Sequence, residues 1–182
     1  KKENFTENSL RIGLVHRLDK YTSGVIVIAK NDSAKAKLAK QFKDRTVKKS
    51  YLALLHGILQ PKEGTIEAPV GRNPHNRKKM AVVSEYKGGK AALTDYKILS
   101  YKDNKYTLVE AMPKTGRTHQ IRVHFASINH PIVGDETYTK LTNDLGIVHQ
   151  ALHAWKLEIK DVNGVKRKFI ANPAKEIFGN IT

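Results

Sequence analysis

The sequence predicts an α+β fold in which a mixed, mainly antiparallel β-sheet is flanked by helices. Short segments rich in β-branched and aromatic residues recur along the 182-residue chain, and turn-forming residues separate many of them. Few segments have the length and periodicity of a helix. With 40% apolar residues, the chain can bury one sizeable core, so we predict a single domain spanning residues 1–182.

The N-terminal part is predicted to contain one strand and one helix. Residues 1–8 are polar, and we expect them to be frayed. Residues 25–29 are apolar and mostly β-branched, which predicts a buried strand. A helix is expected to follow as far as Lys43, because the Asn-Asp-Ser at residues 31–33 offers an N-cap. A second helix is predicted for residues 118–127.

The other predicted elements are strands and the turns between them. Gly57 ends the predicted strand at residues 49–55. The pair Gly88-Gly89 favours a hairpin within the turn at residues 85–90. Further turns are predicted at residues 60–64, 101–105 and 161–164, and a basic loop at residues 71–79. The strands are predicted at residues 49–55, 65–68, 80–83, 91–100, 106–111, 151–159 and 165–170.

The positive charge of the chain predicts a polyanionic partner. Lysine and arginine number 33 against 17 acidic residues, which gives a net charge of +16. Such a field attracts RNA, DNA or an anionic membrane surface, although lysine-rich solvated faces such as residues 35–40 account for part of the excess. A membrane is the weakest of these partners, because no apolar run approaches the ~20 residues needed to span one.

The absence of cysteine excludes disulfides and cysteine-based zinc sites. His119 and His124 are five residues apart, which turns them to different faces of the predicted helix, and no H-E-x-x-H pattern occurs. We therefore expect no metal, and a cytoplasmic location.

Three segments contain the candidate chemistry. Residues 16–30 read H-R-L-D-K-Y-T-S-G-V-I-V-I-A-K, so that Asp19 follows Arg17 by two residues and precedes a turn. Taken without their neighbours, Arg17 and Asp19 could equally form a surface ion pair beside a turn. Residues 49–57 read K-S-Y-L-A-L-L-H-G, and residues 115–124 read T-G-R-T-H-Q-I-R-V-H.

These strings together resemble the RluA-type family of pseudouridine synthases. The first is similar to the family's H-R-L-D-x-x-T-S-G signature, the second to Y-x-A-x-x-x-G and the third to G-R-T-H-Q-I-R-V-H. P-I-V-G-D-E-T-Y at residues 131–138, L-H-A at 152–154 and the basic element at 71–80 also match family motifs. The resemblance extends from residue 13 to about residue 173, with the motifs in the family's order.

The resemblance implies an enzyme that isomerises uridine to pseudouridine in ribosomal or transfer RNA, with no cofactor. It implies that Asp19 is the nucleophile, and that Tyr51 stacks on the target uracil and assists proton transfer at C5. Arg17 is implied to replace the flipped base in the RNA stack, the alternative being a salt bridge to Asp19. Leu152 is implied to form part of the apolar floor under the base.

Arg122 is the predicted partner of Asp19, and it shares a helix face with His119. Arg117 is expected to contact a phosphate or brace the loop, and the two arginines could be exchanged. Asp135 and Tyr138 are interpreted as structural, the one as a turn-capping carboxylate and the other as a packed ring. The basic loop is expected to bind RNA phosphates, unless it is a solvated charge run; its cations are Arg72, Arg77, Lys78 and Lys79.

The chain departs from the family pattern in three ways. We expect it to lack the N-terminal strand segment that precedes the catalytic loop in the family and to lack an S4-type RNA-binding domain. Tyr21 stands where the family usually has aspartate, and the expected roles of its ring are stacking on RNA or simple packing. We expect a catalytic core without those N-terminal strands, acting as a monomer.

Two other functions are possible. A non-catalytic RNA-binding module would not need to retain Asp19, Tyr51 and Arg122 together. A glycosidic hydrolase would need two carboxylates flanking the bond, and no second acidic residue lies in a matching motif.

Overall fold

The computed structural model describes residues 13–179. Within these residues the helices are α1 (Asp32–Lys43), α2 (Gln120–Ser127) and α3 (Lys175–Phe178), and a 3-10 turn, η1, spans Glu85–Lys87. The strands are β1 (Ser23–Gly24), β2 (Lys48–His56), β3 (Glu63–Glu67), β4 (Val70–Arg72), β5 (Met80–Val82), β6 (Leu93–Lys102), β7 (Tyr106–Pro113), β8 (Leu152–Lys160) and β9 (Lys166–Ile170).

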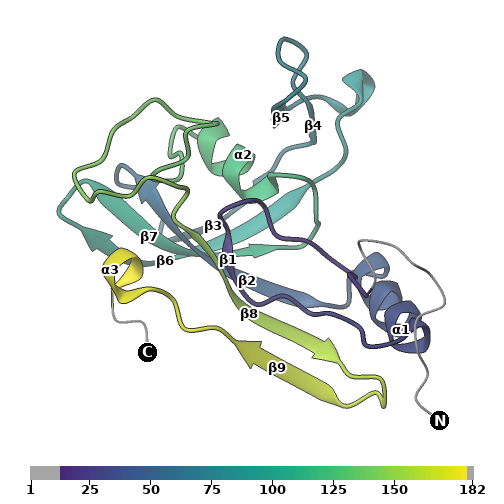
Figure 1. Ribbon diagram of the computed structural model, residues 1–182. Coiled ribbons are helices and arrows are strands. Elements are labelled where there is room, and N and C mark those ends of the chain that lie inside the picture. Colours follow the sequence, from purple (N-terminus) through teal and green to yellow (C-terminus); the bar gives the residue numbers. More distant parts are fainter. Residues whose placement is uncertain (1–12, 180–182) are drawn as a thin grey trace.

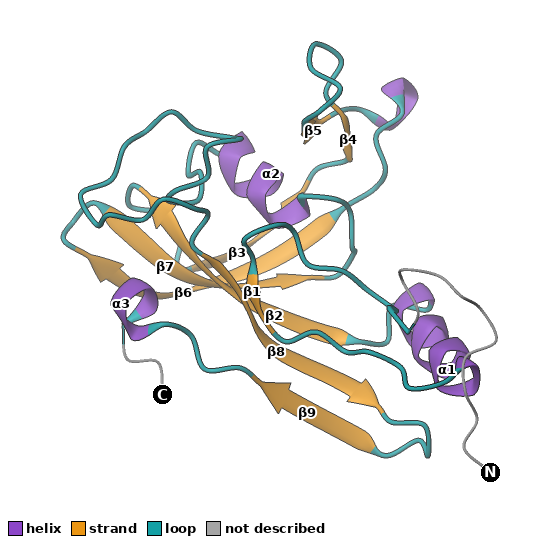
Figure 2. Cartoon of the chain, viewed as in Figure 1, coloured by secondary structure: helices purple, strands orange, loops and turns teal. Residues whose placement is uncertain are grey.

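Seven strands form the main sheet in the order β1-β8-β2-β7-β6-β3, with β9 also paired to β8 (Figure 1). The β1–β8 pair is parallel and every other pair of strands is antiparallel. Helix α2 lies over the sheet and α1 lies at one end of the molecule (Figure 2). This confirms the predicted α+β class with a mixed, mainly antiparallel sheet.

The main core lies around β2, at the centre of the sheet. Because β7 and β8 flank this strand, Leu52 and Leu55 are completely buried. Helix α2 contributes Phe125, which is also completely buried and belongs to the same cluster. The strand that carries Tyr51 is therefore held on both edges, which fixes the position of that side chain.

Residues 25–29 do not form the predicted strand. The parallel ladder ends at Gly24, whose φ is 112° and where a Cβ would lie 2.2 Å from the Ala154 carbonyl oxygen. Beyond that point the same edge of β8 is occupied by β9, which pairs with it from Lys156 onward. Residues 25–29 instead pack towards α1, and Ile28 makes one isolated bridge to Leu14.

The turn at residues 85–90 is not a hairpin. It forms η1, which ends at Gly88 with a φ of 88°. The hairpin is made by β4 and β5, which enclose the basic loop and project from the main sheet (Figure 1). We call residues 70–90 the basic arm. The short helix α3 is absent from the sequence prediction, because four residues show no periodicity.

The expected fraying of residues 1–8 concerns a segment that lies outside the described residues. Within residues 13–179, no helix is long and apolar enough to cross a membrane.

Buried His124 makes the stability of the fold dependent on pH. Its Nδ1 lies 2.9 Å from the Thr94 hydroxyl and its Nε2 lies 2.9 Å from the Ala68 carbonyl oxygen. Burial lowers the pKa of His124 from its ordinary 6.5, against the raising effect of the Ala68 hydrogen bond. The unfolded chain then binds more protons below about pH 6.5, so the free energy of unfolding falls as the pH drops through that range.

We therefore expect urea unfolding to give a lower free energy of unfolding at about pH 5.5 than at about pH 7.5. His124→Gln should show a smaller difference between the two pH values, because Gln keeps a donor for Ala68 but does not titrate. A difference of the same size in the variant would contradict this assignment.

Candidate active site

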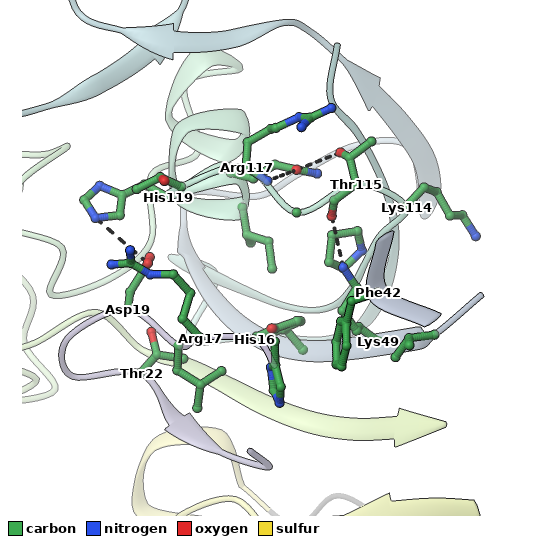
Figure 3. A pocket seen from close by; sticks show the side chains of 18 of the residues that line it. His16, Arg17, Asp19, Thr22, Phe42, Lys49, Lys114, Thr115, Arg117 and His119 are labelled. Carbon is green, nitrogen blue, oxygen red and sulfur yellow. Dashed lines mark hydrogen bonds and ion pairs between the residues drawn. The ribbon is translucent and has the colours of Figure 1, made fainter. Parts of the chain in front are cut away.

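A pocket of about 420 Å³ lies beside β2 (Figure 3), within the size range of small-molecule sites. The loop at residues 15–22, the end of α1 and the segment leading into α2 form its walls. The predicted site residues that line it are Arg17, Asp19, Tyr51, Arg117, His119, Arg122 and Leu152. The other three, Arg72, Arg77 and Lys79, lie on the basic arm.

The Asp19 loop is fastened to the segment that leads into β8. The Thr22 backbone N–H donates to the Asp19 carbonyl at 3.0 Å, which closes a turn. The side-chain amide of Gln150 donates to the Lys20 carbonyl, and the Ser23 hydroxyl lies 2.8 Å from His153 Nδ1. Asp19 is thereby positioned by contacts with residues about 130 positions later in the chain.

Tyr21 has a left-handed backbone, with a φ of 68°. This conformation is unfavourable for a bulky side chain, whereas aspartate accepts it more readily. The Tyr21 ring stacks on His149 with their centroids 3.6 Å apart and an interplanar angle of 7°. Of the two expected roles for Tyr21, RNA stacking or packing, the structure contains the packing contact on one ring face.

Arg122 is the arginine that contacts Asp19, so the structure distinguishes the two that could be exchanged. Its guanidinium is buried and donates two hydrogen bonds to the Asp135 carboxylate, from Nε at 2.7 Å and from Nη2 at 2.8 Å. Its remaining nitrogen, Nη1, lies 3.4 Å from Asp19 Oδ2. Burial opposes the charge of Arg122, but the hydrogen bonds and charge of Asp135 outweigh it and raise the pKa of Arg122.

Asp135 is therefore more than the turn cap that the sequence suggests. It does accept a hydrogen bond from the Thr137 backbone N–H at 3.1 Å, as a turn cap would. Its exposure is only 1%, however, and its charge balances that of Arg122. The local string P-I-V-G-D indicates a turn and contains no sign of a partner on a helix 13 residues earlier.

His119 lies on the other side of Asp19. Its Nε2 is 3.9 Å from Asp19 Oδ1, and its Nδ1 is 2.7 Å from the Tyr138 hydroxyl, which also accepts the Met80 backbone N–H. Burial lowers the pKa of His119, so the ring is neutral at pH 7 despite the opposing charge of Asp19. His119 has a φ of 56° and is the N-cap of α2, which therefore begins at Gln120, two residues later than predicted.

Tyr51 points into the same pocket from β2. Burial, and secondly the charge of Asp19, raise the pKa of Tyr51 to about 12. Its hydroxyl is therefore protonated at neutral pH, and it has no hydrogen-bond partner among the described residues. Leu152 faces Ala53 across the β2–β8 ladder and adds a buried apolar wall.

The remaining cations at the site differ in how they are held. Arg117 donates from Nε to the Ala91 carbonyl at 3.1 Å, which braces the loop before α2. Arg17 is exposed, and within residues 13–179 it forms no salt bridge to Asp19 or to any other carboxylate. On the arm, Lys79 reaches the Thr137 carbonyl at 2.7 Å, and Arg72 donates to the Arg77 carbonyl at 2.9 Å.

The described part of the chain contains no cluster of three or more His, Cys, Asp or Glu side chains that could hold a metal ion. The site consists instead of one carboxylate between an arginine and a neutral histidine, opposite a protonated tyrosine. Such a set can supply a nucleophile and proton transfer from its own residues.

Comparison with known proteins identifies similar chains. A family model described as RNA pseudouridylate synthase matches residues 1–127. Ribosomal large subunit pseudouridine synthase D of Borreliella burgdorferi is 45% identical over 170 residues, which is 93% of this chain and 51% of that protein. The protein of the same name from Nitrosomonas europaea is 47% identical over 156 residues, 82% of this chain and 44% of that protein.

Among solved structures, Human RNA Pseudouridylate Synthase Domain Containing 1 superposes with a TM-score of 0.79 at 34% identity. The match covers 89% of this chain and 69% of the human one. The chain spans about half the length of the curated relatives that it matches.

Proposed function

The chain belongs to the RNA pseudouridylate synthase family, and we propose that it isomerises uridine to pseudouridine in the RNA of the large ribosomal subunit. The observation that supports this most directly is the position of Asp19 in the pocket, beside Arg122 and facing the same space as Tyr51. The names of the most similar relatives favour ribosomal RNA over transfer RNA as the substrate.

The reaction requires a group that holds the substrate after one glycosidic bond has broken and before the other has formed. The N1–C1′ bond of uridine breaks, the uracil rotates and the C5–C1′ bond forms, while the C5 hydrogen leaves as a proton and N1 takes up a proton. Asp19 is the proposed nucleophile, attacking either the ribose or the base. The charge of Arg122 would stabilise the carboxylate each time it is released.

Tyr51 and Leu152 are proposed to hold the uracil. The ring of Tyr51 offers a stacking face, and its pKa of about 12 keeps a proton on the hydroxyl for relay to or from C5. Leu152 contributes an apolar surface under the base.

The target base must leave its stack to reach this pocket, and Arg17 is the proposed replacement. Its side chain is exposed at the pocket and has no carboxylate partner in the described part of the chain. A guanidinium can stack on bases and contact phosphate at once, which suits it to fill the vacated position. Arg117 and His119 are proposed to contact the RNA at the rim.

The basic arm is proposed to contact RNA phosphates through Arg72, Arg77 and Lys79. We expect Arg77→Gln to weaken RNA binding and to reduce the slope of log Kd against log salt concentration by about 0.7–0.9. Lys166→Gln on β9, which removes one exposed charge from another surface, is the control. Equal slopes for the arm variant and the unmodified chain, measured by fluorescence titration, would argue against the arm as a phosphate contact.

Two alternatives are less well supported. Among the residues that line the pocket, Asp19 is the only carboxylate, and Asp135 is bound to Arg122. A hydrolase with two carboxylates flanking the scissile bond therefore lacks its second group. A binding module without catalysis has no need of the buried Arg122 charge beside Asp19.

The test of the proposed function is tritium release from cellular RNA labelled at C5 of uridine. Isomerisation must expel that hydrogen, because C5 becomes the glycosidic carbon. Release into water supports the proposed reaction, whereas no release from large-subunit RNA would contradict it for this chain.

A further inference from the structure

The pocket extends from Asp19 to a second end that the proposed chemistry does not use. Figure 3 shows Phe42, Lys49 and Lys114 on the side away from Asp19 and His119. We call this part the basic end of the pocket. Besides Lys49 and Lys114 we include Lys43, which follows Phe42 at the end of α1, and Arg45, whose charge acts on Lys49; both also line the pocket.

The basic end contains more positive charge than its surroundings balance. Lys114 is paired with Asp95 at 3.0 Å. Lys49 donates only to the neutral Thr115 carbonyl, at 3.1 Å, and neither Lys43 nor Arg45 has an ion-pair partner within residues 13–179. Asp19, the only carboxylate in the lining, is already engaged with Arg122.

These cations also oppose one another. Burial, and then the positive charge of Arg45, lower the pKa of Lys49. The charge of Lys49 in turn adds to the effect of burial in lowering the pKa of His16. An anion between Arg45 and Lys49 would relieve this repulsion, and no side chain in the described residues supplies one.

The backbone places both side chains for such a contact. Arg45 follows the C-cap of α1 with a φ of 56°, so the chain leaves the helix there and Arg45 reaches the pocket. Lys49 precedes Tyr51 by two residues on β2, and although the β2–β8 register shifts between Ser50 and Tyr51, both side chains line the pocket. A base held at Tyr51 therefore shares the pocket with the Lys49 side chain.

We propose that the basic end of the pocket binds a phosphodiester of the RNA strand next to the target uridine, held between Arg45 and Lys49. This rests on the proposed function and adds a subsite to it. The contact would fix the strand on one side of the flipped nucleotide, so that binding energy positions the base over Asp19.

The test compares two single-stranded hexauridylates, one with phosphodiester linkages and one with neutral methylphosphonate linkages. Arg45→Gln should raise the Kd of the phosphodiester strand about tenfold, as the loss of one charge-assisted hydrogen bond does. It should leave the Kd of the neutral strand unchanged. Lys48→Gln, which removes a charge from the exposed neighbour of Lys49 on β2, should change neither value.

The proposal is overturned if Arg45→Gln weakens both strands equally, if it weakens neither, or if the unmodified chain does not bind the phosphodiester strand. Lys49→Gln is a second variant with the same expected pattern, and circular dichroism establishes that it is folded. Because these titrations need no turnover, they are independent of tritium release. In that assay Arg45→Gln should lower kcat/KM, with a fall in kcat as well as a rise in KM, because the contact positions the base.

Discussion

Asp19→Asn is expected to lower the rate of tritium release by about four orders of magnitude or more, which is typical of removing a nucleophile. Asn has nearly the same shape as Asp and can still accept a hydrogen bond from Arg122, so the pocket should keep its geometry. It lacks the charged oxygen that we propose as the nucleophile. The Kd for RNA should therefore change little while turnover is lost.

A matched control is available in Asp103, which is exposed in the turn between β6 and β7 and has a φ of 53°. Asn accepts that conformation as readily as Asp, so Asp103→Asn removes one negative charge at no cost in structure. It should retain full turnover. A variant at Asp19 that lost binding together with turnover would contradict a purely chemical role for this residue.

Asp19→Asn is also expected to change the titration of Tyr51, which can be followed by absorbance. The charge of Asp19 contributes to the raised pKa of Tyr51, although burial contributes more. Asp19→Asn should therefore lower the pKa of Tyr51 without restoring it to 10, as measured by the absorbance of the phenolate.

The second large effect concerns stability. Asp135→Asn leaves the buried guanidinium of Arg122 without its main counter-charge, and breaking such a pair costs about 3–5 kcal/mol. In a domain of this size that corresponds to a fall in Tm of roughly 10 °C. Urea denaturation at pH 7 should show the loss directly.

Glu158→Gln is the control for this change. Its partner is Lys168 at 4.0 Å, and both side chains are about half exposed, so the pair contributes at most about 1 kcal/mol. Equal losses in the two variants would show that the Arg122–Asp135 pair has no special weight. Replacing both members, with Arg122→Met and Asp135→Leu, should recover much of the stability without recovering turnover.

The sequence was most informative where function depends on a contiguous string. Residues 16–30, 49–57 and 115–124 each carry their own pattern, and the structure brings Asp19, Tyr51 and Arg122 from these strings into one pocket. Strands β2, β7 and β8 were predicted within a few residues, because alternation and turns are local properties. Their roles in the reaction remain proposals.

The features that the sequence did not predict depend on contacts between distant segments. Residues 25–29 have the composition of a strand, but β9 occupies the edge of β8 that they would need. Asp135 has the local pattern of a turn, and its pairing with Arg122 exists only when α2 is folded against that turn. The Gly-Gly pair at 88–89 indicates a tight turn without specifying which strands it joins.

The attachment of the Asp19 loop to β8 has a consequence for the order in which the protein folds. β1 is joined to β8 by two residue pairs, Ser23 with His153 and Gly24 with Ala154. The side chain of Gln150 holds the same loop. Closing a loop of about 130 residues carries an entropic cost that nearby contacts do not, and such pairings form late. During synthesis the basic arm leaves the ribosome well before β8 does. If the proposed function holds, a nascent chain thus completes the arm proposed to bind RNA before Asp19 is held in place, and the proposed nucleophile is the last part of the site to be positioned.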